Sequence, residues 1–246
     1  MIFVAIDDTD NINTRGTGRL SRNIAKVLSK KYPIKGIVRH QLLVHPDIPY
    51  TSHNGNAVIH IDIDLNKHRE FENYTSSNDL LKEIFEDTKK EMLDDFIEGS
   101  DPGLAVASDT QVSSSLIAYG IDAKEKVLTQ DQGRELSKNL GILLEGLGGT
   151  EDGVIGAMAG IGLSSTYNDG RYLFVGKVRD LLGNQTVKSL LKSGIDEVVS
   201  IYGEPIKQDA VIKVGENKSL RPSPINNKVV LFVENIEGEL VPLKRK

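Results

Sequence analysis

The order of apolar and polar residues along the chain predicts a mixture of strands and helices. An unbroken apolar run at residues 2–6 indicates a strand that is buried on both faces. Apolar residues at positions 20, 24, 27 and 28 then follow the i, i+4, i+7, i+8 spacing of one buried helix face. Residues 57–65 alternate like a half-buried strand, and residues 104–107 are expected to form a short strand.

Three later segments have helical patterns. An acidic helix is predicted to follow residue 78, with one apolar stripe, and to end near Gly99. Thr129 occupies a typical N-cap position, and leucines at 136, 140, 143 and 144 predict a helix over about 129–144. Residues 150–161 predict a helix rich in Ala and Gly. The expected fold class is therefore α+β, a mixed sheet with packed helices.

The composition changes after about residue 180, which indicates a second unit. Residues 184–194 predict a compact helix, and strands are expected at 197–201, 210–214 and 229–233. A chain of 246 residues can form two modest domains with their own cores. We therefore expect a nucleotide-binding domain over residues 1–180 and a smaller α/β, ferredoxin-like unit over residues 181–246.

Three carboxylates follow the first strand directly, in Asp7-Asp8-Thr9-Asp10. Like charges at this spacing repel one another unless a cation lies among them. Mg²⁺ is a suitable cation, because it binds one or two carboxylates, keeps several waters and bridges to nucleotide phosphates. Asp7, Asp8 and Asp10 are therefore candidate metal-binding and catalytic residues, and either Asp7 or Asp8 can alternatively be a base. An acidic turn without a ligand remains the structural alternative.

A glycine loop with basic flanks comes next. Gly16-Thr17-Gly18 leads into the first predicted helix, between Arg15 and Arg19. Backbone N–H groups at a helix N-terminus attract anions, and arginine binds phosphate with two donors. The loop therefore predicts phosphate binding beside the acidic turn, whereas a tight connection without a ligand is the alternative. The loop is not a Walker A motif.

Glycine is densest between residues 146 and 162, where Gly153 and Gly156 fall in the Ala- and Gly-rich helix. Small residues on a helix allow either a neighbouring backbone or a nucleotide to approach closely. Tight packing of the helix on the sheet and a nucleotide-facing helix are equally compatible with this pattern.

Five short motifs in order resemble the archaeal tRNA-isoleucine agmatinylcytidine synthetase family. Asp7-Asp8-Thr9-Asp10 with Arg15-Gly16 is similar to that family's N-terminal signature, in its ATP-using, kinase-like domain. The other four, which extend the resemblance over about the first 175 residues, are Arg39 through Ile48-Pro49-Tyr50, Asn54-Gly55-Asn56-Ala57, Asp101-Pro102-Gly103, and Gly153-Val154-Ile155-Gly156-Ala157 through Gly162.

The resemblance implies an ATP-binding, Mg²⁺-dependent domain for phosphoryl or nucleotidyl transfer. By the resemblance, nucleotide-binding positions include Thr9, Gly153 and Gly156 in addition to the glycine loop. The positions implied to face the substrate are Arg39, Tyr50, Asn54, Gly55, Asn56, Asp101 and Gly103. Asn54-Gly55 and Asp101-Pro102-Gly103 are also ordinary turn sequences, so a purely structural role is the alternative for both.

The chain departs from the family pattern at one motif. The synthetase has a Cys-Thr-Thr run where this chain has Thr17-Gly18-Arg19. The sequence also lacks any cysteine for the family's zinc ribbon, and a shorter relative is expected. The acceptor, a small molecule or tRNA, stays open. A non-catalytic nucleotide- or small-molecule-binding protein and a tRNA-modification subunit that needs a partner are the alternatives.

The charge and the absence of cysteine limit the partners and metal sites that the protein can have. A net charge of −5 argues against a broad nucleic-acid footprint, although the first predicted helix is basic and the segment 70–98 is strongly acidic. Without cysteine there is no disulfide or thiolate metal site. The N-terminus lacks the pattern of a signal peptide, and no segment has the length of a membrane span, so we expect a cytoplasmic protein with no membrane partner.

Overall fold

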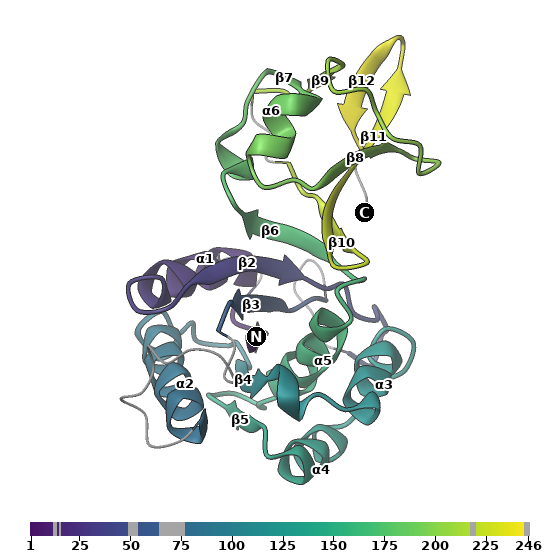
Figure 1. Cartoon of the computed structure of the whole chain (residues 1–246). Coiled ribbons are helices and arrows are strands. Elements are labelled where there is room, and N and C mark those ends of the chain that lie inside the picture. Colours follow the sequence, from purple (N-terminus) through teal and green to yellow (C-terminus); the bar gives the residue numbers. More distant parts are fainter. Residues whose placement is uncertain (12–13, 15, 49–53, 64–76, 217–219, 244–246) are drawn as a thin grey trace. The chain divides into compact units, whose positions relative to one another are not determined.

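The computed structural model describes residues 1–11, 14, 16–48, 54–63, 77–216 and 220–243. Helices and strands occur along the whole of this described part of the chain (Figure 1). The chain forms two compact units, Met1–Thr166 and Tyr167–Lys246. The α+β class is confirmed. The second unit begins at Tyr167 and includes the strand at residues 171–175, whereas the first domain was expected to extend to residue 180.

An antiparallel sheet forms the centre of the first unit. Its strands lie in the order β5-β4-β1-β3-β2, with β1 between β3 and β4. The strand bounds are β1 Ile2–Asp7, β2 Ile34–Arg39, β3 Ala57–Ile61, β4 Gly103–Ser108 and β5 Leu143–Gly146.

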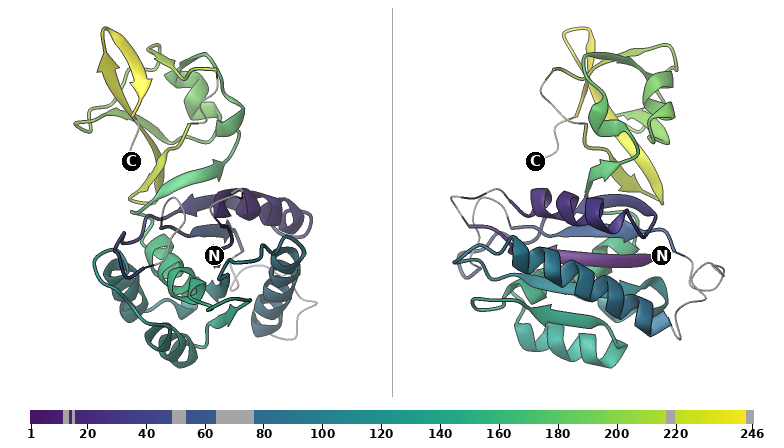
Figure 2. Two further views of the ribbon diagram at one scale, coloured as in Figure 1. Left: turned by 180° about the vertical axis from the view of Figure 1, so that it is seen from behind. Right: turned by 90° about the vertical axis from the view of Figure 1, so that its left-hand side faces the viewer.

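Helices cover both faces of this sheet (Figure 2). The helices α1 (Thr17–Leu28) and α2 (Ser77–Asp94) contact each other and one face. The opposite face is covered by α5 (Gly153–Ser165), which in turn contacts α3 (Ser114–Asp122) and α4 (Gln130–Leu140). A short 3₁₀ helix, Asp109–Gln111, follows β4. Every residue of β1 is buried, which confirms the prediction from its unbroken apolar run.

The second unit contains a smaller sheet. Its strands β10 (Ser223–Ile225), β11 (Lys228–Ile236), β12 (Glu239–Pro242), β9 (Val211–Lys213) and β7 (Asn184–Thr186) are neighbours in that order, and β8 (Glu197–Ser200) pairs with β11. The strand β6 (Arg171–Val175) and a 3₁₀ helix, Val178–Asp180, precede it. Among the residues described here, α6 (Val187–Lys192) is its single α-helix. A ferredoxin-like unit has two helices, so that part of the prediction is not confirmed.

Three predicted elements differ from the structure. The helix from Thr129 ends at Leu140 because Gly141 adopts a left-handed conformation (φ 67°), and Leu143–Gly146 pairs with β4 as a strand. The strand β3 is buried along its whole length, since it lies between two strands and under helices on both faces. The predicted helix over 184–194 begins with the strand β7, and Thr186 caps α6.

None of the helices in the described ranges combines the length and apolar composition that a transmembrane segment requires.

Candidate functional site

The acidic turn lies where β1 leaves the sheet, beside the start of β4. Asp7 is opposite Gly103 in the antiparallel register. The backbone N–H of Asp101 donates to the Asp8 carbonyl oxygen over 3.2 Å, and the Gly153 N–H donates to the Asp101 carbonyl oxygen over 2.9 Å. Two motifs nearly a hundred residues apart are thereby brought to the N-terminus of α5.

Glycines allow α5 to approach this strand end closely. A Cβ atom at Gly103 would overlap with the backbone of Gly153, and a Cβ atom at Gly156 would overlap with Oδ2 of Asp7. Asn56 supports the same contact, because its Nδ2 donates to the Gly156 carbonyl oxygen over 2.7 Å. The packing role predicted for this glycine-rich helix is therefore confirmed at Gly153 and Gly156, and both residues also line the adjacent pocket.

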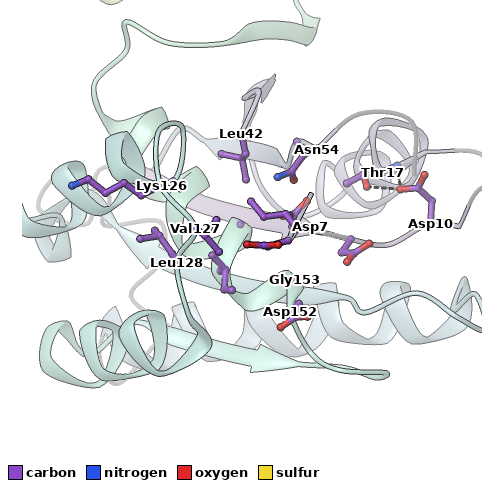
Figure 3. A pocket seen from close by; sticks show the side chains of 17 residues that line it. Asp7, Asp10, Thr17, Leu42, Asn54, Lys126, Val127, Leu128, Asp152 and Gly153 are labelled. Atoms are coloured by element: carbon purple, nitrogen blue, oxygen red, sulfur yellow. Dashed lines mark hydrogen bonds between the residues drawn. The ribbon is translucent and has the colours of Figure 1, made fainter. Parts of the chain in front are cut away.

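The pocket has an acidic side and an apolar side (Figure 3). Its volume is about 160 Å³. The acidic side is formed by Asp7, Asp8, Asp10, Asp47 and Asp152. The apolar side is formed by Leu42, Ile48, Ala123, Val127, Leu128 and Ile155. Thr17, Asn54, Gly55 and Lys126 complete the lining with the two glycines of α5.

Burial and mutual repulsion perturb two of these carboxyl groups. Burial raises the pKa of Asp7 to about 8, and the charges of Asp8 and Asp10 contribute in the same direction, while Arg39 opposes them. Burial and then the charges of Asp101, Asp10 and Asp152 raise the pKa of Asp8 to about 6. Asp7 is therefore mainly protonated at neutral pH, and the ionised form of Asp8 is less favourable than that of a free carboxylate until a cation lies beside it.

The glycine loop is connected to the acidic turn by hydrogen bonds. Oδ1 of Asp10 accepts from the Thr17 backbone N–H over 3.3 Å and from the Thr17 hydroxyl over 3.0 Å (Figure 3). The hydroxyl of Thr9, which is buried, donates to the Thr17 hydroxyl oxygen over 3.1 Å. Asp10 therefore satisfies the first N–H group of α1, in the manner of an N-cap.

The structure brings some predicted site residues into the pocket and leaves others beside it. Those that line it are Asp7, Asp8, Asp10, Thr17, Asn54, Gly55, Gly153 and Gly156. Those that do not are Thr9, Gly16, Gly18, Arg19, Arg39, Asn56, Asp101 and Gly103. Predicted positions Arg15 and Tyr50 lie outside the described residues.

Two of the predicted residues, Asp101 beside the pocket and Gly55 in its lining, are packed or bonded closely to its parts. Oδ1 of Asp101 accepts from the backbone N–H of Thr150, in the loop before α5. Gly55 fits closely against the strand before it, since a Cβ atom there would lie 2.6 Å from the His40 carbonyl oxygen and 3.3 Å from Nε of Arg39.

Sequence reasoning missed Asp152 and the apolar side of the pocket. Asp152 accepts hydrogen bonds from Gln130 Nε2 (2.7 Å) and the Thr150 hydroxyl (2.8 Å), so its carboxylate is held at the start of α5. Its place directly before Gly153 was an available signal. The apolar side includes Ala123, Val127 and Leu128, which follow α3, a helix that the sequence analysis did not assign.

The donor set suits a magnesium ion better than a preformed all-protein metal site. In the described part of the chain, no group of three His, Asp or Glu side chains has the arrangement of a metal cluster. Mg²⁺ requires only one or two carboxylates when waters and phosphates complete its shell. The carboxylate of Asp8 has no hydrogen-bond or ion-pair partner within the described ranges, although three other carboxylates raise its pKa. Asp8 therefore fits a cation ligand.

Comparison with solved structures identifies a similar fold. The crystal structure of apo TiaS (tRNAIle2 agmatidine synthetase) matches 65% of this chain with a TM-score of 0.51 and 19% sequence identity. The fold is similar to that of a tRNA agmatidine synthetase. The TiaS-tRNA(Ile2)-ATP complex matches the same share with a TM-score of 0.51 and 20% identity, and a tRNA fluorescent labeling enzyme does so with 0.52 and 20%.

The resemblance inferred from the sequence motifs is thus confirmed for the fold. The match covers 35% of the apo TiaS chain and 36% of the chain in the ATP complex, so this chain spans about a third of the synthetase's length. No protein-family model and no curated protein matches the sequence.

Proposed function

We propose that this protein binds ATP with Mg²⁺ at the acidic turn and transfers a phosphoryl or nucleotidyl group in the modification of a tRNA. The observation that carries the proposal is the pair Asp7 and Asp8, which line one side of a pocket and whose pKa values are raised by burial and by the charges of neighbouring carboxylates. The fold supports it, because one structure that shares it was solved as a complex with tRNA and ATP.

The acidic side of the pocket would hold the ion and the phosphates. Asp8 is the principal ligand, with Asp10 or Asp7 as a second carboxylate. Bound Mg²⁺ would neutralise charge on the transferring phosphoryl group. Gly156 holds the Asp7 carboxyl at the strand end, and Arg39 favours its ionised form, so that Asp7 can accept either the ion or a proton.

The apolar side would hold an organic part of a ligand. A pocket of about 160 Å³ is smaller than the roughly 300 Å³ of small ligand sites, so it encloses one portion of ATP or of the acceptor. Leu42, Val127 and Leu128 offer the surface on which that portion would pack.

A non-catalytic binding protein is the second candidate. It is favoured by the sequence Thr17-Gly18-Arg19 at the position of the synthetase's Cys-Thr-Thr run, and by the Thr17 hydroxyl, which is bonded to both Asp10 and Thr9. Nucleotide binding without turnover would support this candidate.

Turnover of labelled ATP tests the proposal. The protein is incubated with Mg²⁺, unfractionated tRNA and a mixture of primary amines, and ATP carries the label on its α- or γ-phosphate. Label on an acceptor or release of AMP or ADP is expected, and Asp8→Asn should reduce the rate by about 100-fold or more, as removal of a key charge in an active site does.

Asp62→Asn is the matched control, because Asp62 is exposed at the opposite end of the sheet, just after Ile61, which pairs with Ile2. An Asp8→Asn variant that folds and turns over ATP as the parent does would refute the assignment.

A further inference from the structure

The exposed face of α1 and the turn after it carry a basic stripe, which we define as Arg19, Lys26 and Lys30 with the half-exposed Arg22 beside them. At about 100° per residue, Arg19 and Lys26 fall within roughly 20° of each other on the helix, and Lys30 lies in the turn that follows Leu28, the last residue of α1. Arg19 and Lys26 are about 10 Å apart along the helix axis at 1.5 Å per residue. The apolar residues Leu20, Ile24 and Leu28 occupy the buried face.

The ion pairs of the described residues do not include the three exposed cations of the stripe. Within those residues, none of Arg19, Lys26 and Lys30 lies within salt-bridge distance of a carboxylate. The next cation behaves differently, since Lys31 Nζ donates to Glu83 over 3.0 Å and to Asp87 over 2.8 Å on α2. Within the described residues, the charges of Arg19, Lys26 and Lys30 are therefore not compensated by an ion pair.

The exposed charges of the neighbouring helix are mixed in sign. On α2, which contacts α1 on the same side of the sheet (Figure 2), Glu86 and Asp94 are exposed, and so are Lys82 and Lys90. Exposed charge of a single, positive sign therefore lies on α1, where a polyanion would be attracted.

The stripe also begins at the pocket. Thr17, the first residue of α1, lines the pocket, and Arg19 follows within the same helical turn. We propose that the α1 stripe is a binding surface for the phosphate backbone of an RNA substrate, which places part of that RNA at the pocket. This inference rests on the proposed function for its choice of RNA, and on the geometry of α1 for the location.

Charge neutralisation at the far end of α1 tests the proposal. The variant is the full chain with Lys26→Gln and Lys30→Gln, and neither residue lines the pocket. The matched control is Lys82→Gln with Lys138→Gln, two exposed lysines on other helices of the same unit. Fluorescence anisotropy measures the dissociation constant for unfractionated tRNA between about 50 and 200 mM salt.

The α1 variant is expected to bind tRNA roughly tenfold more weakly than the parent, with the slope of log affinity against log salt reduced by about two, while the control binds as the parent does. Equal weakening in the control, unchanged binding in the α1 variant, or no tRNA binding by the parent would overturn the proposal. Displacement of tRNA by poly-glutamate at equal charge would overturn the assignment to RNA.

Calorimetric titration with Mg-ATP separates this inference from the proposed function. If the α1 variant binds nucleotide as the parent does but binds tRNA more weakly, the result supports the stripe as an RNA-binding surface. Absence of nucleotide binding in the parent refutes the proposed function. In that case the tRNA-binding measurement alone decides whether the stripe binds RNA.

Discussion

At the scale of single residues, the site depends on one carboxyl group held in an unfavourable environment. Asp7 is 8% exposed, and burial raises its pKa to about 8. Ionising this carboxyl group costs more free energy in the folded state than in the unfolded chain. Each unit of difference in pKa between the two states corresponds to about 1.4 kcal/mol. The acidic turn is thus expected to reduce stability near neutral pH in the absence of a cation.

We predict that Asp7→Asn stabilises the protein at alkaline pH. The pKa of Asp7 is raised in the folded state, from 3.8 to about 8, so the folded state binds more protons and loses stability as the pH rises through that window. Asparagine does not ionise. The difference in unfolding free energy between variant and parent, measured with urea, should increase by a few kcal/mol between pH 5 and pH 8.

Asp62→Asn again provides the control, since this exposed group lies at the other end of the sheet. A variant-minus-parent difference that stays constant across the pH range would contradict the raised pKa of Asp7.

Gly156 is predicted to be essential for the position of Asp7. In Gly156→Ala the new methyl group would overlap with Asp7 Oδ2, so either the helix or the carboxyl must move. Overpacking of this kind typically costs about 1–3 kcal/mol. Gly16→Ala is the control for stability, because its Cβ would lie 3.6 Å from Asp10 Oδ2, an ordinary contact. Thermal unfolding of both variants tests the difference, and equal melting temperatures would contradict it.

At the scale of elements, the site is a meeting point of β1, β4 and α5. Asp101 connects them, because its N–H donates to Asp8 and its carbonyl and carboxylate oxygens accept from Gly153 and Thr150. Its charge is also the largest repulsion that acts on Asp8. One residue therefore both assembles the elements and perturbs the carboxylate assigned to the metal.

We predict that Asp101→Asn lowers the pKa of Asp8 below about 6 while the fold is retained. The amide oxygen can still accept from the Thr150 N–H, but the negative charge beside Asp8 is removed. Titration of the Asp8 carboxyl carbon by NMR measures the shift. An unchanged Asp8 pKa in a folded Asp101→Asn variant would contradict the contribution of the Asp101 charge.

Element identity was predictable where local patterns and packing agree. The apolar run of β1 and the cap at Thr129, where Gln132 completes a capping box, were both read from the sequence. Leu143 and Leu144 were assigned to the wrong element, because their spacing continues the helical stripe. Pairing with β4 across the left-handed turn at Gly141 decides their conformation, and that contact is tertiary.

At the scale of the whole molecule, motif order indicated the fold and the acidic side of the site. The rest of the pocket could not be predicted, because its lining comes from segments that only the sheet order and the packing of α3 and α5 bring together. Ala123 and Val127 follow no recognisable local pattern. Asp10 was predicted as a metal ligand, yet it also caps α1, which is a contact that sequence spacing alone does not reveal.

Ligand-induced protection is predicted to be confined to the first unit. Mg-ATP bound to the acidic turn stabilises the elements that hold it, by an amount that grows with ligand concentration. Hydrogen exchange with and without Mg-ATP should show slower exchange at residues 2–11, 101–108 and 150–160, and no change in Tyr167–Lys246. Protection restricted to the second unit would contradict the site.

The most direct test of the central claim is calorimetric titration of ATP into the parent, Asp8→Asn and Asp62→Asn, each with and without Mg²⁺. The account predicts Mg²⁺-dependent binding to the parent and to Asp62→Asn, with proton release at pH 7 as Asp7 ionises beside the bound ion. It predicts that Asp8→Asn binds ATP with Mg²⁺ at least tenfold more weakly than the parent, which corresponds to roughly 1.4 kcal/mol of binding free energy. Equal binding by all three proteins, or no dependence on Mg²⁺, would contradict a nucleotide and metal site at the end of β1.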